Sequence, residues 1–360
     1  MLPGLNIKGT GRKPGPALLF SELLLAYHEA RRHKRKSTGA REFECNQESE
    51  LAQLTLAIVE QRYTLSPETC FLVHQPVKRE IFAAHFRDRV VHHWIFNRIN
   101  SILEPHFIHD CYSCRTNKGT LFGIRRLEGF LKSCTHNHTQ TAWFLKLDVS
   151  GFFMAMNRQF LWDILMRHLL RSPQVFTDGL LEPVLRTIVF HDPTQGCLMH
   201  ADRCGWHDLP ANKSLFHSAP GCGLPIGNLT SQLFANVYLN ELDQYIKREL
   251  KVRYYGRYVD DMVFVHSDKS FLTALVPLVR SYLRDHLGLE LHPKKIYLQP
   301  VEHGVPFLGV FILPYRTYPG RRVVANFRLA LRNHAPVQVL ESYLGMFGHH
   351  DAMRVTHKPS

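Results

Sequence analysis

Apolar residues recur at helical spacing along much of the chain. Positions three and four apart lie on one face of a helix, so this spacing predicts amphipathic helices. Between them lie shorter, β-prone runs whose length and composition are typical of strands. The predicted helices are residues 16–35, 48–63, 88–103, 120–133, 157–170, 230–250 and 271–287, followed by a helical tail.

The strand-like runs begin with residues 69–77, "TCFLVHQPV". Residues 142–153, "AWFLKLDVSGFF", alternate in polarity and predict a core strand. Residues 253–266, "RYYGRYVDDMVFVH", predict two short strands joined by a tight turn, and a strand pair ends at "FLGVFIL". Residues 191–222 are rich in Gly, Pro, His and Asn and are interpreted as a loop or insertion. Helices and strands mixed in this order predict an α+β fold.

The charge of the chain favours a polyanionic partner. Its 360 residues carry a formal net charge of +13. Neutralising phosphates with release of counterions is the commonest use of such a surplus, which favours nucleic acid. The alternative is a basic surface that serves solubility alone. The run "RRHKRK" at residues 31–36 has the same two interpretations, a solvated helix end or a patch that follows phosphates.

The eight cysteines are scattered and do not resemble a disulfide scaffold, so we expect reduced thiols. The first residues, "MLPGLNIKGTGRKPGP", lack the apolar core of a signal peptide. No apolar run is long enough to span a membrane. We therefore expect a soluble, cytoplasmic protein.

Three carboxylates stand at the ends of apolar strands. Asp148 ends the strand in "FLKLDVSGFF", and Asp260 and Asp261 lie together between two strands in "YVDD". Burying adjacent ionised carboxylates is costly, and a divalent cation removes that cost. Magnesium prefers such oxygen ligands, and two ions about 3.5–4 Å apart stabilise an in-line phosphoryl displacement. The alternative for the Asp-Asp pair alone is a solvated turn.

The residues around these carboxylates resemble the conserved boxes of reverse transcriptases. "YVDD" resembles their signature box, and "LKLDVSGFF" resembles their first catalytic box. "GLPIGNLTSQLFANVYLNELD" is similar to the box between them, and "HPKK" and "VPFLGVFI" follow in the expected order. The resemblance covers roughly residues 20–348, and several motifs in order are more specific than one.

This resemblance implies a right-hand polymerase fold with an antiparallel palm sheet. The divisions it implies are a helical N-terminal extension at residues 1–65, fingers at 66–140, a palm at 141–310 with an insertion at 191–222, and a thumb at 311–360. It implies two Mg²⁺ ions held by Asp148, Asp260 and Asp261, with Val149 beside them.

Further site residues follow from the same resemblance. Lys295, or its neighbour Lys294, matches a general acid that protonates pyrophosphate. The implied primer grip is Phe307, Leu308 and Gly309.

The incoming nucleotide would meet residues from several motifs. Lys78 and Arg79 match the family's contacts to the triphosphate. Phe153 matches the aromatic gate that excludes a 2′-hydroxyl; the alternative is a core residue, because Phe152 and Phe153 would point to opposite faces of a sheet. The remaining candidates are Arg115 and Lys118 for phosphate or template, Arg87 and Arg89 for template or bracing, and Ile226, Gly227 and Gln232 around the nucleotide. Gly119 would permit close backbone approach beside Lys118.

Three features resemble the reverse transcriptases of diversity-generating retroelements. Many polymerases of this class have Gln where "IGNLTSQ" has Ile226, and an alkyl side chain loses a hydrogen bond worth on the order of 1 kcal/mol. The subgroup resembles this chain there and is error-prone opposite template adenine. The alternative is a packing variant without effect on fidelity. "WHDLPANKSLFHSAPGCGLP" resembles the subgroup's insertion, and "FRDRVVHH" with "CYSCRTNKGT" is also close.

The subgroup implies mutagenic retrohoming with a template-repeat RNA, a DNA primer, dNTPs and a small basic accessory protein, in a bacterial or phage-encoded system. No RNase H, endonuclease or maturase extension is expected. Alternatives within the class are retron, defence-type or intron-type enzymes. An alternative outside it is a non-catalytic RNA-binding scaffold.

Four potential zinc ligands lie in the insertion, Cys197, His200, Cys204 and His207. The usual long spacer between ligand pairs is missing, so a His-rich loop is the alternative.

Overall fold

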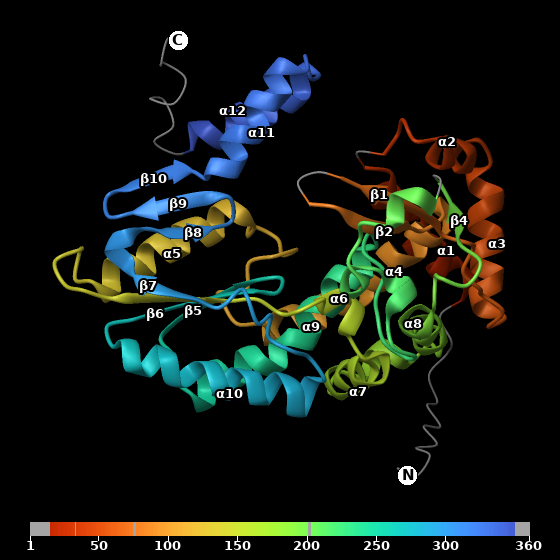
Figure 1. The fold of residues 1–360 in the computed structure, drawn as a ribbon. Helices are drawn as coiled ribbons and strands as arrows, with labels where there is room; N and C mark the ends of the chain where they lie inside the picture. Colours follow the sequence, from red (N-terminus) through yellow and green to blue (C-terminus); the bar gives the residue numbers. More distant parts are fainter. Residues whose placement is uncertain (1–14, 33, 75–76, 201–202, 350–360) are drawn as a thin grey trace. The chain divides into compact units, whose positions relative to one another are not determined.

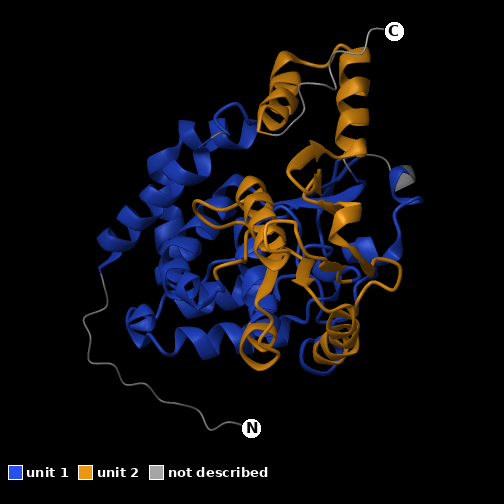
Figure 2. Cartoon of the chain, turned by 90° about the vertical axis from the view of Figure 1, so that its left-hand side faces the viewer, with its two compact units in different colours: residues 1–108, 150–243, 283–289 blue, residues 109–149, 244–282, 290–360 orange. Residues whose placement is uncertain are grey.

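The computed structural model describes residues 15–32, 34–74, 77–200 and 203–349, apart from the side chains of residues 203 and 204. The chain forms two compact units, each built from separate stretches of sequence (Figure 2). Unit 1 comprises Met1–Ile108, Ser150–Asp243 and Leu283–Leu289. Unit 2 comprises His109–Val149, Gln244–Tyr282 and Glu290–Ser360.

Unit 1 opens with a group of helices that pack on one another. These are α1 (Pro16–Arg31), α2 (Thr38–Cys45), α3 (Gln47–Val59) and α4 (Phe86–Leu103). The apolar face of α1 packs mainly on α4 and α3, and Tyr27 of α1 stacks on Phe43 of α2 with ring centroids 5.4 Å apart. Helix α1 ends at Arg31, earlier than predicted, because the charged residues that follow offer no apolar side chain to bury.

The sheet of unit 1 has the order β2-β1-β4. Strand β1 (Thr69–Val73) pairs antiparallel with β2 (Arg79–Ala83) and parallel with β4 (Leu198–Met199). The predicted strand at 69–77 is therefore shorter than expected, and β2 was not predicted. The segment 191–222 is more than a loop, since it supplies β4 and the 3₁₀ turns Arg203–Trp206, Ala211–Lys213 and Leu215–His217.

The remaining helices of unit 1 precede or follow the segment 191–222 in the sequence. They are α6 (Phe152–Ala155), α7 (Arg158–Leu169), α8 (Leu181–Phe190) and α9 (Leu229–Gln244). The side chain of Asn157 caps α7 by accepting a 3.0 Å hydrogen bond from the backbone N–H of Phe160. Helix α9 is buried along most of its length, and a π-helical turn, Tyr245–Glu249, continues it where residues 230–250 were predicted as one helix. Helix α8 was not predicted.

Unit 2 is built around a four-stranded antiparallel sheet with the order β5-β6-β3-β7. Its strands are β3 (Trp143–Leu147), β5 (Tyr254–Tyr258), β6 (Asp261–His266) and β7 (Tyr297–Pro300). Figure 1 shows α5 (Thr120–Cys134) along one side of this sheet and α10 (Lys269–Leu287) along the other. Phe144, Val263 and Val265 face α5 in a buried core with Ile124 and Leu127.

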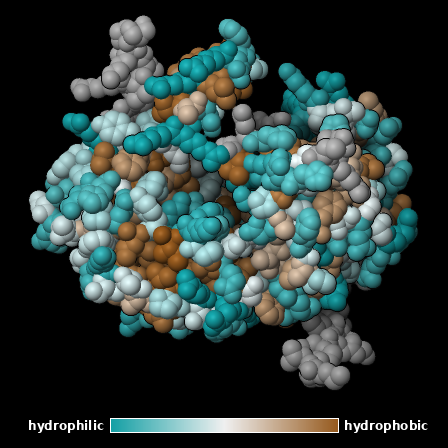
Figure 3. Space-filling model, viewed as in Figure 1, coloured by the Kyte–Doolittle hydropathy of each residue, from teal (hydrophilic) through white to brown (hydrophobic). Residues whose placement is uncertain are grey.

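The C-terminal part of unit 2 is a meander followed by two helices. Its elements are β8 (Val305–Phe307), β9 (Val310–Leu313), β10 (Arg316–Pro319), α11 (Arg321–Arg332) and α12 (Val337–Gly348). Phe327 and Phe347 hold α11 and α12 together, with ring centroids 5.0 Å apart. Both helices also expose apolar side chains, seen as brown atoms at the top of Figure 3.

Antiparallel sheets combined with helices confirm the predicted α+β class. None of the described helices has the length and apolar character needed to cross a membrane.

Candidate active site

The three predicted carboxylates lie at the same end of the sheet in unit 2. Asp148 follows the last residue of β3, and Asp260 lies in the turn between β5 and β6, whose first residue is Asp261. Strand β3 is hydrogen-bonded to β6 with Leu147 opposite Met262. This register brings the end of β3 to the β5–β6 turn, although more than a hundred residues separate them in the chain.

Burial and mutual repulsion perturb the carboxylates. Desolvation raises the pKa of Asp260 to about 7, and the charges of Asp148 and Asp261 add to this rise. Burial also raises the pKa of Asp261, and Lys146 opposes that rise. The cluster therefore has more negative charge than its surroundings neutralise.

Two lysines partly neutralise this charge. Lys295 Nζ donates a 2.8 Å hydrogen bond to Asp148 Oδ1. Lys146 Nζ lies 3.1 Å from Asp261 Oδ1. A short turn holds Lys295 in place, because the backbone N–H of His292 donates to Asp148 O and that of Lys295 donates to His292 O. The structure places Lys295 against the cluster, whereas the backbone N–H of Lys294 donates to His292 Nδ1.

Sequence reasoning missed Lys146. A signal was present: Lys146 is the one charged residue within the apolar strand β3, two positions before Asp148. A half-buried ammonium group on an otherwise apolar strand indicates an anion nearby.

The donor set fits a divalent cation by its chemistry. Three carboxylates supply hard oxygen ligands of the kind that Mg²⁺ takes. In the arrangement seen within residues 15–32, 34–74, 77–200 and 203–349, no group of three or more His, Cys, Asp or Glu side chains is close enough to hold a metal ion. Asp148 and Asp261 are instead paired with lysines. Val149, the fourth residue predicted at the metal site, is buried and forms a β-bridge with Leu291.

The loop before α5 supports the carboxylate turn. Arg257 on β5 is fully buried, and its Nη1 donates a 2.8 Å hydrogen bond to the backbone oxygen of Val259, the residue before Asp260. The N–H of Val259 in turn donates to Ser113 Oγ at 3.2 Å. Tyr112 N donates to Arg257 O at 2.9 Å. The positive φ of Val259, 54°, is therefore held in place from both sides.

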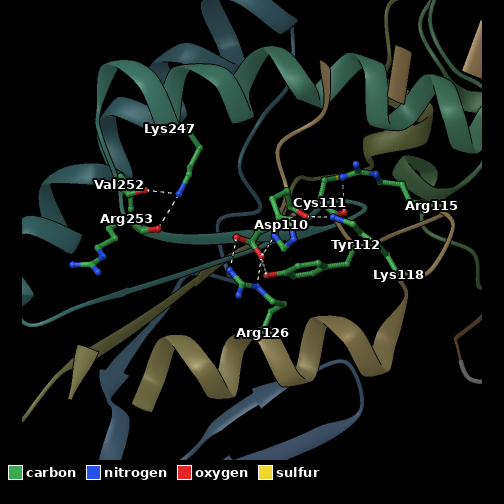
Figure 4. Close-up of polar contacts among 10 residues, drawn as sticks. Asp110, Cys111, Tyr112, Arg115, Lys118, Arg126, Lys247, Val252 and Arg253 are labelled. Atoms are coloured by element: carbon green, nitrogen blue, oxygen red, sulfur yellow. Dashed lines mark hydrogen bonds and ion pairs between the residues drawn. The ribbon is translucent and has the colours of Figure 1, made fainter. Parts of the chain in front are cut away.

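Figure 4 shows how this loop is held. Asp110 accepts hydrogen bonds from Arg126, at 2.6 and 3.0 Å, and from the Tyr112 hydroxyl at 3.3 Å. Arg115 Nη1 donates to the Cys111 carbonyl at 3.1 Å, and Lys118 Nζ donates to the His109 carbonyl. Both predicted phosphate or template contacts thus brace their own loop in this structure.

The predicted primer grip forms the turn between β8 and β9. Leu308 and Gly309 have φ values of 46° and 86°. Phe307, the last residue of β8, is buried in the core of unit 2, so its side chain anchors the start of the turn. Gly309 O accepts a 2.8 Å hydrogen bond from Gly320 N, which fixes the turn to the start of α11.

In unit 1, several predicted nucleotide contacts share one apolar cluster. Phe153 and Ile226 both pack on a buried group made of Cys70, Phe82, Met154 and Leu215. Ile226 O accepts a 3.0 Å hydrogen bond from Phe82 N on β2. A Cβ on Gly227, at φ +136°, would lie 2.7 Å from Phe82 O, so glycine is required there.

The strand expected to continue to Phe153 ends at Leu147, which corrects the sequence prediction. Gly151 has a left-handed φ of 54°, and Phe152 and Phe153 lie in the short helix α6. Their orientation on opposite sheet faces is therefore wrong. Phe152 is buried, while Phe153 is half-buried.

The charged and polar candidates of unit 1 are carried by β2 with the residue before it, by α4 and by α9. Lys78 Nζ lies 3.9 Å from Asp208 Oδ2, and Arg79, the first residue of β2, is exposed. Gln232 is exposed on α9. Arg87 and Arg89 donate to the backbone oxygens of Thr64 and Ala84, which agrees with the bracing role.

The four possible zinc ligands are only partly described, because the side chain of Cys204 lies outside the described residues. Cys197 Sγ lies 3.9 Å from Met199 Sδ.

Comparison with known proteins identifies the class. The model of the family "Reverse transcriptase (RNA-dependent DNA polymerase)" matches residues 78–312. That span is more than half of the chain and includes all three carboxylates. The chain therefore belongs to the reverse transcriptase family.

Individual relatives are distant. Over 273 residues the chain is 25% identical to Protein YkfC of Escherichia coli (strain K12), covering 67% of this chain and 65% of YkfC, just under two thirds. It is similar to the apo telomerase of Candida tropicalis truncated from its C-terminal domain, with a TM-score of 0.46 and 12% identity over 70% of this chain and 54% of that one. For the telomerase of Candida albicans in complex with a fragment of telomeric RNA, the TM-score is 0.48 and the identity 10%, over 72% and 47%.

Proposed function

We propose that this chain is an RNA-directed DNA polymerase whose reaction takes place at Asp148, Asp260 and Asp261. The observation that carries the proposal is the meeting of these carboxylates at one end of a β-sheet within a chain of the reverse transcriptase family. By their donor chemistry they would hold two Mg²⁺ ions. Bound there, the ions would neutralise charge on the attacking 3′-hydroxyl and on the departing pyrophosphate.

The residues around the carboxylates have separate roles in this proposal. Lys295 would donate a proton to the pyrophosphate, and its hydrogen bond to Asp148 would keep the ammonium group next to the reacting phosphates. Lys146 would hold Asp261 in a fixed orientation. The turn of Phe307, Leu308 and Gly309 would position the primer end.

We assign the nucleotide contacts to Lys78, Arg79, Arg115, Phe153, Ile226, Gly227 and Gln232. The shared packing of Phe153 and Ile226 on one buried cluster supports a common role at the sugar and base of the nucleotide. The fingers, palm and thumb boundaries given above belong to the same proposal.

We further propose that the enzyme belongs to a diversity-generating retroelement and is error-prone at template adenines. Ile226 supports this, because its alkyl side chain has no hydrogen bond to offer a base or sugar. The template-repeat RNA, the small basic accessory protein, retrohoming and a bacterial or phage-encoded origin follow as parts of this proposal. Retron, defence-type and intron-type enzymes are the alternatives.

The central experiment is primer extension on an RNA template with dNTPs and Mg²⁺. Wild-type protein should extend the primer, and Asp260→Ala should abolish extension while RNA affinity stays unchanged. If wild-type protein binds RNA but makes no cDNA, the non-catalytic scaffold is favoured instead.

Sequencing of the cDNA tests the subclass. Misincorporation should concentrate at template adenines, and Ile226→Gln should reduce it. Faithful copying of adenines by wild-type enzyme would contradict the mutagenic role while leaving the polymerase assignment intact.

A further inference from the structure

Glu80 is a fully buried carboxylate on the strand that carries the proposed triphosphate contacts. It follows Arg79 on β2 and has 0% of its surface exposed. A carboxylate in such a place is stable only when donors surround it. Trp206 Nε1 and Ser214 Oγ donate to Glu80 Oε2 at 2.7 and 2.8 Å, and Leu215 N donates to Oε1 at 2.7 Å.

All three donors come from the segment 191–222. The same segment meets β1 through backbone bonds, since Leu198 N donates to Glu68 O at 2.8 Å and His200 N donates to Cys70 O at 2.9 Å. Its Leu215 also belongs to the buried cluster on which Phe153 and Ile226 pack. The segment is therefore attached to both long strands of the sheet, and Glu80 makes the attachment on the β2 side.

The position of Glu80 in β2 gives this attachment a consequence for its neighbours. Successive residues of a strand point to opposite faces. Because Glu80 is fixed inward, Arg79 is directed to the exposed side. Lys78, just before the strand, is half-buried, and its Nζ lies 3.9 Å from Asp208 Oδ2 in the same 191–222 segment. A shift of Glu80 would move the backbone that carries both cations.

We propose that Glu80 is a positioning residue for the incoming nucleotide. Through its three hydrogen bonds, the 191–222 segment sets where Lys78 and Arg79 stand to receive the triphosphate. This inference rests on the proposed polymerase function and gives the insertion a role in it.

The first test is Glu80→Gln, which preserves size but supplies one acceptor oxygen instead of two. In either orientation of the amide, its NH₂ group faces a donor, either Leu215 N or Trp206 Nε1. We expect the KM for dNTP to rise about tenfold, since one buried donor loses its acceptor. The kcat should stay within about twofold of wild type, because no group acting in the transition state is removed.

Glu68→Gln is the matched control. It makes the same substitution at another buried carboxylate of unit 1, one whose side chain accepts its hydrogen bond from Asn228, while His191 Nε2 of the 191–222 segment lies 4.0 Å from Glu68 Oε1, beyond hydrogen-bond distance. Its KM for dNTP should equal that of wild type. RNA affinity and thermal unfolding are measured for all variants.

Ser214→Ala is a milder variant that removes one donor and leaves the carboxylate two. It should raise the KM for dNTP about threefold, and by less in the Glu80→Gln background, because both changes affect the same interaction.

The outcomes separate the two proposals. If wild-type protein extends primers and both variants retain its KM, the positioning role is wrong and the polymerase function stands. If the variants bind RNA more weakly and have a lower kcat as well as a higher KM, Glu80 serves general stability and the inference is also wrong. If wild-type protein does not incorporate nucleotides at all, the proposed function itself fails.

Discussion

Burial of Glu68 should make the stability of this protein fall as pH rises. The side chain lies just before β1 with 2% of its surface exposed, and Oε1 accepts a 3.1 Å hydrogen bond from Asn228. Oε2 is buried without a hydrogen-bond partner among the described residues. Desolvation raises the pKa of Glu68 from 4.5 to about 7, against the opposing effect of Asn228.

The direction of the effect follows from proton binding. Between pH 4.5 and about 7 the folded state binds more protons at Glu68 than the unfolded state does. The contribution to stability is therefore complete below pH 4.5, is lost as pH rises through about 7, and changes no further above that. A difference of about 2.5 pKa units corresponds to roughly 3 kcal/mol.

Glu68→Gln should remove this pH dependence. The amide oxygen can still accept from Asn228, and its NH₂ group replaces an oxygen that has no described partner. At pH 8 the variant should be more stable than wild type by up to roughly 3 kcal/mol, and at pH 4.5 the two should be equal. Urea unfolding at several pH values measures the difference.

A constant difference between Glu68→Gln and wild type from pH 4.5 to 8 would refute the reasoning. It would mean that Glu68 has the same proton affinity in the folded and unfolded chain. His191 Nε2 lies 4.0 Å from Glu68 Oε1, so His191→Gln is examined in parallel to separate the two titrations.

Three further predictions concern unit 2 and the proposed nucleotide contact Lys78. Gly256→Ala should destabilise the fold by about 1–3 kcal/mol in urea unfolding, because its Cβ would lie 2.2 Å from the Tyr112 hydroxyl; equal stability would show that the loop adapts. Lys295→Ala should lower the rate constant of incorporation in single-turnover extension by about 100-fold with little change in the KM for dNTP, whereas Lys294→Ala should leave both unchanged. Equal effects of the two substitutions would refute the assignment of the proton donor. Asp208→Asn should lower the KM for dNTP by no more than about fivefold, because the exposed ion pair that competes for Lys78 is worth at most about 1 kcal/mol; an increase in KM would contradict this.

The positions of the three carboxylates could be predicted because each lies at the end or the beginning of an apolar strand. Alternating polarity located β3, two short strand-like segments joined by a tight turn located β5 and β6, and the family resemblance implied that one sheet carries all three carboxylates. The charged partner Lys146 was not predicted, since a single polar residue in a strand does not reveal which anion it faces. The roles assigned to the site residues and the domain boundaries remain predictions.

The end of β3 and the presence of β2 could not be predicted, because they depend on local backbone conformation and on contacts between residues far apart in the sequence. The run from Trp143 to Phe153 has the composition of one strand, but Gly151 adopts a left-handed conformation against Asn212, whose carbonyl lies 2.6 Å from where a Cβ would be. Similarly, Lys78 and Arg79 were interpreted only as contacts to the triphosphate, and no strand was predicted there. The partners that bury Glu80 in β2 lie more than a hundred residues later, where no local pattern indicates them.

The position of β3 also has a consequence for synthesis of the chain. Both strands that pair with β3 come later in the sequence: β6, and then β7, in which Pro300 lies opposite Trp143. During synthesis, the backbone groups of this apolar segment therefore stay unpaired until the residues of β6 and β7 have been made. Such a delay favours slow folding and misassembly, so a chaperone that shields β-edges should increase the yield of active protein.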